Sequence, residues 1–343
     1  MVSEGRAECF GAPIRPNSWI TIEEPHQHPI LADEPSVLEI KPSHGGSWKI
    51  VNESTIPTGW TEAAQVAQQQ HGVTAIVGDV DSGKSSLCTF LANMCVQNGL
   101  KVGVIDADLG QADIGPPTTV SSAHASEPVY SLRELQPENA FFVGDTSPSS
   151  VQDKLIRSVV ELKKNLTDST EAIILNTDGW VGDSAALRFK EELLHETRPD
   201  LVLGLGGEEI ERLLGIVSST SIRLSTSSYA RPRSKEERKS AREAGYRRFL
   251  LGSKTLKISQ ETSKLRMFDQ PQQSILRWDR RLKGFLAGLL DAKQRLLSIG
   301  RIREISDRNA LVETKTTQQP SFLEIGNVLL SSNYEEIGYG NLH

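Results

Sequence analysis

Eight residues near position 80 have the types and spacing of a phosphate-binding loop. The run Gly78-Asp79-Val80-Asp81-Ser82-Gly83-Lys84-Ser85 fits the pattern GxxxxGK[ST]. In such a loop the glycines let the backbone wrap a phosphate, and the following helix adds partial positive charge at its N-terminus. We expect Lys84 to reach the β- and γ-phosphates of a nucleotide and Ser85 to hold Mg²⁺. The alternative is a glycine-rich turn that matches by chance, which the flanking apolar and amphipathic segments disfavour.

Two carboxylates follow the next apolar run. In Val104-Ile105-Asp106-Ala107-Asp108, Asp106 and Asp108 stand at i and i+2 and therefore on one face at the end of a strand, the edge where parallel sheets bind ligands. One carboxylate would complete the Mg²⁺ shell and the other would accept a proton, the two tasks that phosphoryl transfer needs. The alternative is that both serve metal ligation in an ATPase.

Basic residues gather between positions 231 and 254. This window holds nine Lys and Arg against three Glu and has a net charge of +6, whereas the whole chain is at −6. The surface as a whole is therefore not basic enough to bind nucleic acid broadly, and any such binding must be local. The window suits phosphate contact, and the alternative is a solvated basic helix.

The elements that must position these residues have an α/β pattern. We expect parallel strands at 73–77, 101–106, 140–143, 172–176 and 201–205, with helices near 58–67, 87–95, 151–166, 184–195 and 208–214. Leu87, Phe90, Leu91, Met94 and Cys95 form the apolar stripe of the helix after the loop, and Asn98-Gly99 ends that helix. The predicted fold class is α/β: a P-loop NTPase domain with a parallel sheet, flanked by small N-terminal and C-terminal β modules.

Composition divides the chain into three parts. We expect a β module over 1–55 with strands at Ser18–Ile22 and Val37–Ile40, a P-loop domain over 56–255, and a mainly β module over 256–343. In the last part 286–290 is predicted to be helical, and 299–305 and 311–316 are predicted to be strands. Cys9, Cys88 and Cys95 cannot form a disulfide framework, and Cys88 and Cys95 are expected to pack in the core.

Four motifs occur in a fixed order between residues 78 and 242. They are Gly78 to Ser86, Asp106-Ala107-Asp108-Leu109-Gly110-Gln111, Asn176-Thr177-Asp178-Gly179-Trp180 and Arg233-Ser234-x3-Arg238-x3-Arg242. Together they resemble the polynucleotide 5′-hydroxyl kinases related to the kinase subunit of the pre-mRNA cleavage complex. The third motif is similar to the TxGW clasp of that family and the fourth to its arginine lid. The pair Pro116-Pro117 resembles the nucleolar and archaeal branch, and Ser86 stands where the family usually has Thr.

The resemblance implies roles for particular residues. It places ATP on the loop residues Gly78, Asp79, Val80, Asp81, Ser82, Gly83, Lys84, Ser85 and Ser86. Ser85 and Asp106 are expected to hold Mg²⁺. It implies that Asp108 activates the 5′-hydroxyl of a polynucleotide and that Gln111 lies near the metal and phosphates. By the same resemblance Thr177, Gly179 and Trp180 form the clasp. Arg233 belongs to the lid motif and is expected to contact the nucleotide, and Arg238 and Arg242 close over the transferred phosphate.

The predicted function is transfer of the γ-phosphate of ATP to the 5′-hydroxyl end of RNA, or of DNA. One alternative is an ATP-binding structural subunit of an RNA-processing assembly with little or no turnover, against which Asp108 and the lid arginines argue. Another is a dimeric switch ATPase, which typically carries an additional lysine where this loop has Asp79, Val80 and Asp81. Because no stretch approaches the roughly 20 apolar residues of a membrane span, we expect a cytoplasmic protein, nuclear or nucleolar in a eukaryote, without a membrane partner.

Overall fold

The computed structural model describes residues 1–343 apart from 25, 44, 271–277 and 341–343. Two compact units make up the described chain. The first comprises Met1–Val104, His124–Leu135 and Lys163–Arg233, and the second comprises Ile105–Ala123, Gln136–Leu162 and Ser234–His343. The elements β6 (Val102–Ala107), β7 (Thr119–Ala125) and α3 (Gln152–Thr167) contribute residues to both units. The domain boundaries at 55 and 255 stay predictions.

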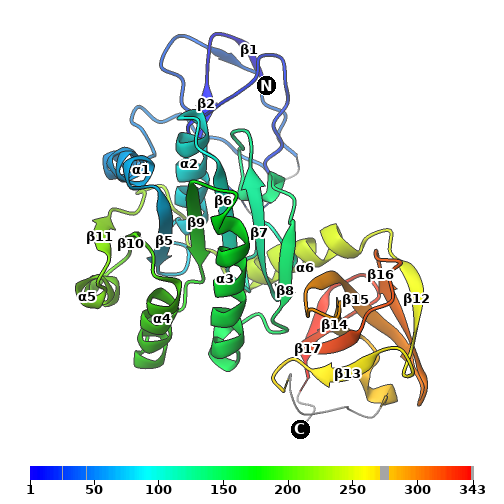
Figure 1. The fold of residues 1–343 in the computed structure, drawn as a ribbon. Coiled ribbons are helices and arrows are strands. Elements are labelled where there is room, and N and C mark those ends of the chain that lie inside the picture. The colour runs from blue at the N-terminus through cyan, green and yellow to red at the C-terminus, as the bar shows by residue number, and fades with distance from the viewer. Residues whose placement is uncertain (25, 44, 271–277, 341–343) are drawn as a thin grey trace. The chain divides into compact units, whose positions relative to one another are not determined.

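Parallel strands form the core of the first unit (Figure 1). They are β5 (Gly72–Gly78), β9 (Ala172–Thr177), β10 (Leu201–Leu205) and β11 (Thr220–Leu224). Hydrogen-bonded neighbours follow the order β11-β10-β5-β9, and all three pairings are parallel. Strands β9 and β10 are buried along their whole length, as strands covered on both faces of a sheet must be. The predicted parallel sheet is therefore confirmed for the strands at 73–77, 172–176 and 201–205. The strand predicted at 140–143 is present, but it pairs antiparallel with its neighbour at 119–125, so its predicted parallel direction is wrong.

Four helices pack in the first unit. They are α1 (Thr58–Gln70), α2 (Lys84–Gln97), α4 (Ser184–Thr197) and α5 (Glu208–Ile216). The apolar stripe of α2 faces the core as predicted, and Cys88 and Cys95 are buried within it. Burial raises the pKa of Cys95 to about 11, so this thiol stays protonated and inert near neutral pH. None of the described helices combines the length and apolar character that a bilayer crossing requires.

The N-terminal residues form two short antiparallel pairs. Strand β1 (Val2–Glu4) pairs with β4 (Val37–Leu38), and β2 (Glu8–Cys9) pairs with β3 (Ala12–Pro13). The predicted strand over Ser18–Ile22 is wrong, because this segment forms no strand. Trp19 is 45% exposed and Ile22 is 40% exposed, so the apolar side chains that favoured a strand are not covered by a second layer.

The second unit contains a mainly antiparallel sheet (Figure 1). Its strands are β12 (Lys254–Ser259), β13 (Lys264–Met267), β14 (Phe285–Leu290), β15 (Leu296–Ile305), β16 (Asn309–Thr314), β17 (Phe322–Leu330) and β18 (Glu336–Tyr339). Their order is β12-β16-β15-β14-β17-β13, with β18 on β17, and β13 alone among the described strands of this sheet pairs in parallel. The unit also holds β8 (Asn139–Phe142), antiparallel to β7, and α6 (Lys235–Leu250). Short 3₁₀ turns lie at Leu132–Glu134, Pro148–Ser150 and Arg280–Leu282.

Strand β14 corrects a prediction. The run Leu286–Leu290 was expected to be helical, yet it lies in a buried strand between β15 and β17. A short apolar run fits a buried helix and a buried strand equally well, and only partner strands decide between them. Gly288 also has a packing role: a Cβ there would lie 2.4 Å from Cγ of Phe142, so this glycine makes room for the ring.

The packing of Phe142 generates a prediction about stability. Its side chain is 1% exposed, whereas the adjacent Phe141 is only partly buried. We expect Phe142→Ala to lower the free energy of unfolding by about 3 to 5 kcal/mol, because the ring leaves a cavity. Denaturant unfolding followed by circular dichroism measures the loss, with Phe141→Ala as the neighbouring control. Equal losses in both variants would contradict the assignment of Phe142 to this core.

Candidate active site

The phosphate-binding loop lies between β5 and α2, as the motif predicts. Strand β5 ends at Gly78 and α2 begins at Lys84, with Gly83 as the preceding cap at φ 97°. The Lys84 side chain is buried, and its Nζ donates to the carbonyl oxygens of Gly78 at 3.0 Å and Asp79 at 2.7 Å. The loop therefore encloses the lysine ammonium, where it meets whatever phosphate the backbone wraps.

Two variable positions of the motif tie the loop to other segments. The carboxylate of Asp79 accepts from the backbone N–H of Gly207 at 3.3 Å, beyond the end of β10. The carboxylate of Asp81 accepts from the backbone N–H of Arg233 at 2.9 Å and from its Nε at 2.8 Å. Arg233, which was predicted to contact the nucleotide, is thus held beside the loop by the side chain of a loop residue.

The third variable position, Val80, lies directly against the predicted clasp. A Cβ on Gly179 would lie 2.7 Å from Cγ2, 2.8 Å from Cα and 2.9 Å from N of Val80. Any side chain at 179 would force the two backbones apart, so glycine is required there by the close approach. The sequence prediction that residues 177–180 serve the loop is consistent with this contact in the first unit.

A buried ion pair positions the clasp. Lys190 on α4 is fully buried, and its Nζ donates to Oδ2 of Asp178 at 2.5 Å and to the Asp178 carbonyl at 2.9 Å. The other oxygen of Asp178 accepts from the backbone N–H of Trp180 at 2.9 Å. The Trp180 ring stacks on Phe189 at 5.9 Å between centroids, and its Nε1 donates to Asp183 at 2.9 Å. Helix α4 therefore fixes both the backbone and the ring of the clasp.

Sequence reasoning missed Lys190, although a signal was present. The buried residues of α4 are Ala186, Phe189, Lys190, Leu193, Leu194 and Thr197. A lysine on an apolar stripe must find a buried acceptor, because an unpaired charge in the core is costly. Its position on that stripe, rather than its residue type, marked it as a structural cation.

Neighbouring polar groups complete the loop region. Thr177 donates through Oγ1 to the carbonyl of Ile76 at 2.8 Å, which ties β9 to β5 next to the loop. The Ser85 hydroxyl accepts from Nδ2 of Asn176 at 3.4 Å. The Ser82 hydroxyl is buried and finds no hydrogen-bond partner within the described part of the chain. A buried hydroxyl donor without a protein acceptor, within such a loop, fits an anionic ligand, which supports binding of a triphosphate here.

In the second unit Asp106 organises the loop that follows β6. Its Oδ1 accepts from the backbone N–H of Asp108 at 3.3 Å. Its Oδ2 accepts from the backbone N–H groups of Asp113 at 2.6 Å and Ile114 at 3.1 Å. Burial raises the pKa of Asp106 to about 7, with further contributions from the carboxylates of Asp113 and Asp108. Both oxygens of Asp106 therefore have a structural role, and its metal role stays a prediction.

Asp108 is half-buried on the same loop. Its Oδ1 accepts from the N–H of Gly110 at 3.1 Å and of Gln111 at 2.9 Å, so the carboxylate is held at a defined position. Nε2 of Gln111 donates to the Arg238 carbonyl on α6 at 3.3 Å. The structure thus brings together Asp108, Gln111 and the backbone of the predicted lid, all within the second unit.

The basic window forms helix α6. Ser234 and Glu237 make a reciprocal capping box at its start, which fixes where the helix begins. Arg242 donates through Nε and Nη2 to the two carboxylate oxygens of Glu336 on β18, at 2.6 and 2.7 Å. Burial lowers the pKa of Arg242, but the Glu336 carboxylate outweighs that effect and the net shift is upward. Sequence reasoning missed Glu336, because the residues around it give no sign that it pairs with an arginine of α6.

The residues present also fit Mg²⁺. Among the residues that the structure describes, no three His, Cys, Asp or Glu side chains are grouped to hold a metal by themselves. Mg²⁺ at nucleotide sites is bound through one or two protein oxygens together with phosphate oxygens and water, so a ready-made cage is not needed. Ser85 and Asp106 are oxygen donors of that kind.

Several known proteins are similar to this chain in sequence. The family model described as mRNA cleavage and polyadenylation factor CLP1 P-loop matches residues 78–252. A polyribonucleotide 5′-hydroxyl-kinase of Pyrococcus furiosus is 34% identical over 189 residues, which cover 54% of this chain and 52% of the relative. One of Methanocaldococcus jannaschii is 34% identical over 190 residues, covering 53% and 51%. The chain thus spans about half the length of the curated relatives it matches.

Solved structures support the fold. Clp1p in a complex with a Pcf11p segment superposes with a TM-score of 0.73 at 12% identity, covering 96% of this chain and 92% of Clp1p. A second structure, titled for the extended interface between Pcf11p and Clp1p, gives a TM-score of 0.74 at 13% identity. At this level of identity the likeness establishes the fold class alone, a P-loop NTPase with additional β domains.

The raised pKa of Asp106 predicts a pH dependence of stability. Between about pH 4 and 7 the folded chain keeps a proton that an unfolded Asp has released, so this group favours the folded state less as the pH rises. We expect the free energy of unfolding of the wild type, relative to that of Asp106→Asn, to fall over that range. The fall is at most about 4 kcal/mol, at about 1.4 kcal/mol per pH unit. Urea unfolding at several pH values, in buffer with a chelator, measures it. A difference that does not change with pH would contradict the burial of an ionisable carboxyl here.

Proposed function

Because the chain belongs to the CLP1 P-loop family, we propose that it is an ATP-dependent polynucleotide 5′-hydroxyl kinase that acts on RNA ends. The observation that carries the proposal is the loop around the buried Lys84 ammonium, against which the clasp backbone packs at Val80. The names of the archaeal relatives support the reaction and the acceptor. RNA is favoured over DNA for the same reason.

In this proposal the first unit binds the donor nucleotide. Lys84 contacts the β- and γ-phosphates of ATP, and the backbone of residues 78–86 surrounds them. Ser85 and Asp106 are the two predicted oxygen ligands that would hold Mg²⁺, which would neutralise charge on the phosphate oxygens. Thr177, Gly179 and Trp180 clasp the reacting groups, and Asp178 with Lys190 keeps them in place.

The second unit supplies the groups that act on the acceptor. Asp108 takes the proton of the 5′-hydroxyl, a role that suits a half-buried carboxylate whose Oδ1 is fixed by two backbone N–H groups. Gln111 lies between this loop and α6. Arg238 and Arg242, one helical turn apart, neutralise charge that develops on the transferred phosphoryl group.

Label transfer tests the function. Wild-type protein is incubated with γ-labelled ATP, Mg²⁺ and matched 5′-hydroxyl RNA and DNA oligonucleotides, and we expect label on the RNA. Lys84→Ala should abolish transfer, because it removes the cation that bridges the β- and γ-phosphates. A folded Lys84→Ala variant with near wild-type transfer would refute the role of the loop.

The alternative function is an ATP-binding structural subunit with little or no turnover. Binding of labelled ATP without transfer to either oligonucleotide would favour this alternative over the kinase.

Two substitutions separate the roles of the carboxylates. Asp108→Asn should keep ATP binding but lower kcat about 100- to 10,000-fold, the usual cost of losing a general base. Asp106→Asn should raise the Mg²⁺ concentration needed for half-maximal rate. The measurement is kcat against Mg²⁺ concentration for both variants. If Asp106→Asn were the slower and excess Mg²⁺ did not restore it, the two roles would be reversed.

The lid has its own prediction. Arg238→Lys keeps the charge and loses the planar fork, so we expect kcat to fall by a larger factor than KM for ATP rises. Lys239→Ala, on an exposed neighbouring position, should mainly weaken RNA binding in a salt-dependent way. Steady-state kinetics at two salt concentrations compares them. Equal and purely salt-dependent losses would mean that α6 only attracts nucleic acid.

A further inference from the structure

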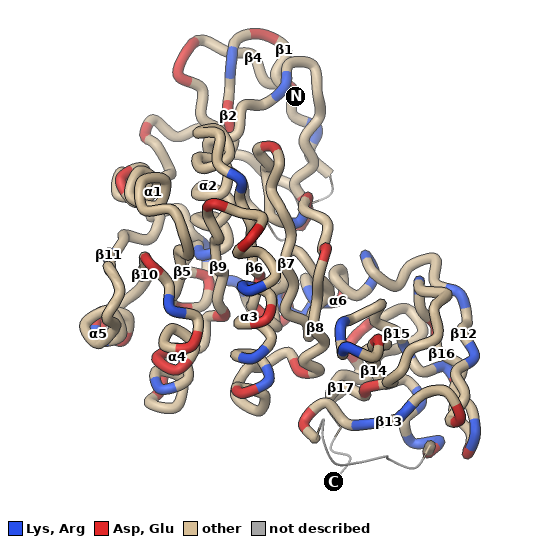
Figure 2. The backbone as a smooth tube through the Cα atoms, viewed as in Figure 1, with Lys and Arg blue, Asp and Glu red and all other residues tan. Residues whose placement is uncertain are grey.

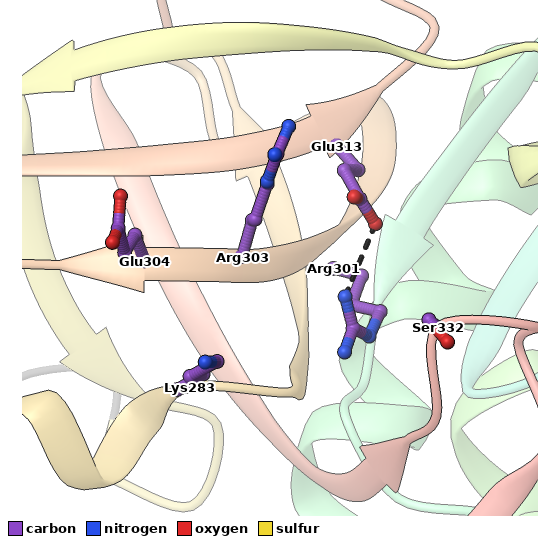
Figure 3. Close-up of a pocket in the computed structure, with 6 residues that line it drawn as sticks. All are labelled: Lys283, Arg301, Arg303, Glu304, Glu313 and Ser332. Carbon is purple, nitrogen blue, oxygen red and sulfur yellow. Dashed lines mark hydrogen bonds and ion pairs between the residues drawn. The ribbon is translucent and has the colours of Figure 1, made fainter.

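A hollow of about 570 Å³ on the C-terminal sheet combines cations from several elements. Its lining residues are Lys283, Arg301, Arg303, Glu304, Glu313 and Ser332, and they come from the segment after the last 3₁₀ turn, from β15, from β16 and from the turn after β17 (Figure 3). The hollow lies within the second unit and outside the residues assigned to the reaction.

The charges of this hollow favour an anion. Nη1 of Arg301 pairs with Oε2 of Glu313 at 3.2 Å, and its Nε donates to the Leu330 carbonyl at 2.9 Å, so these two charges offset each other (Figure 3). The other charged lining residues, Lys283, Arg303 and Glu304, are all exposed, and Nη1 of Arg303 donates to the Thr255 hydroxyl at 3.4 Å. The local balance of solvent-facing charge is therefore positive.

The surrounding module shares this sign. Residues 254–343 contain 14 Lys and Arg against 10 Asp and Glu, a net charge of +4 in a chain whose total is −6. Figure 2 shows basic positions on β12 and β13 of the same sheet. A basic module on an otherwise acidic chain is the electrostatic pattern of local nucleic-acid contact.

An aromatic residue lies two positions from a lining residue of the hollow. Tyr334 is half-exposed in the turn that also contributes Ser332. Its backbone N–H donates to the Ser331 carbonyl at 3.1 Å, which holds Tyr334 on this turn. Cations next to an aromatic face are the combination that binds single-stranded nucleic acid without sequence preference.

The hollow is also next to the strand pair that holds the lid. Leu330, whose carbonyl binds Arg301, is the register partner of Glu336 across β17 and β18. Glu336 in turn pairs with Arg242. Ser332 and Glu336 are four positions apart, so at most about 14 Å of chain separates them at 3.6 Å per residue. A strand with its end under the lid has its following phosphates within reach of this surface.

We propose that this hollow binds backbone phosphates of a single-stranded polynucleotide, downstream of the 5′ end that receives the phosphate. Lys283 and Arg303 contact the phosphates, and Tyr334 offers a face to a base. This docking site rests on the proposed function, because it extends the binding of the same acceptor beyond the reacting end.

Substrate length tests the docking site. The variant Lys283→Ala/Arg303→Ala is compared with Lys264→Ala/Lys293→Ala, which removes two exposed cations that do not line the hollow. Steady-state transfer is measured on a 5′-hydroxyl dinucleotide and on a 20-residue RNA at two or more salt concentrations. Thermal unfolding verifies that both variants fold.

We expect the hollow variant to raise KM for the long RNA severalfold and to leave kcat and the dinucleotide kinetics unchanged. The slope of log KM against log salt should fall by about 1.4, at 0.7 per phosphate contact on a single strand. The control variant should match wild type. Equal losses in both variants, or no loss in either, would overturn the docking site.

A direct binding measurement separates this inference from the kinase proposal. If wild type transferred no label even to the dinucleotide, the proposed function would fail, and anisotropy of a labelled 20-residue RNA would still test the hollow. Full affinity of Lys283→Ala/Arg303→Ala for that RNA would refute it. So would polyglutamate of equal length that bound as tightly as RNA and lost the same affinity in the variant, because the surface would then suit an acidic protein.

Discussion

The first unit depends on the contacts that hold residues 79–81 of the phosphate-binding loop against three other segments. The GxxxxGK[ST] pattern leaves these positions undefined, yet here each one holds a different segment: Asp79 the residues after β10, Val80 the clasp, and Asp81 Arg233. A phosphate-binding loop must be stiff before the ligand arrives if its N–H groups are to be directed inward without further ordering cost. In this chain side chains of the loop itself provide the stiffness.

The second unit solves a similar problem with acidic groups. Three carboxylates each accept hydrogen bonds that fix a neighbouring group. Asp106 holds the loop after β6, Asp108 holds the backbone N–H of Gln111, and Glu336 holds the Arg242 guanidinium. Hydrogen bonds to charged groups are stronger than neutral ones, so few are needed to fix each element. Carboxylates therefore position the loop after β6 and the lid helix in this unit, and one of them, Asp108, is also the proposed general base.

Sequence predicted the parts of the fold that are encoded locally. The strand at 201–205 and the helix starting at Ser184 were correct because apolar runs and the Asp183 cap act within a few residues. Leu286–Leu290 was misread because its identity as a strand depends on β15 and β17 as partners. Ser18–Ile22 failed for the converse reason, since a β-prone run without partners stays irregular.

The same division holds for the candidate site. The four motifs could be found in the sequence, together with the phosphate contacts proposed for them, because their spacing is short and their residue types are few. Lys190 and Glu336 escaped because each acts through a partner that only the tertiary fold supplies. Of the two, Lys190 was the easier to predict, since a charged residue on a buried helical stripe breaks the apolar pattern of that stripe.

The pairing of Arg242 with Glu336 has a consequence for how the protein is made. The two residues are 94 positions apart, so a ribosome that adds about 5 to 20 residues per second needs roughly 5 to 20 seconds between them. Helix α6 can form early, since its capping box is local, but its arginine has no permanent partner until β18 has been synthesised. The nascent chain therefore carries the lid helix before it carries the carboxylate that fixes Arg242, and the guanidinium takes its defined position only once β18 has been made.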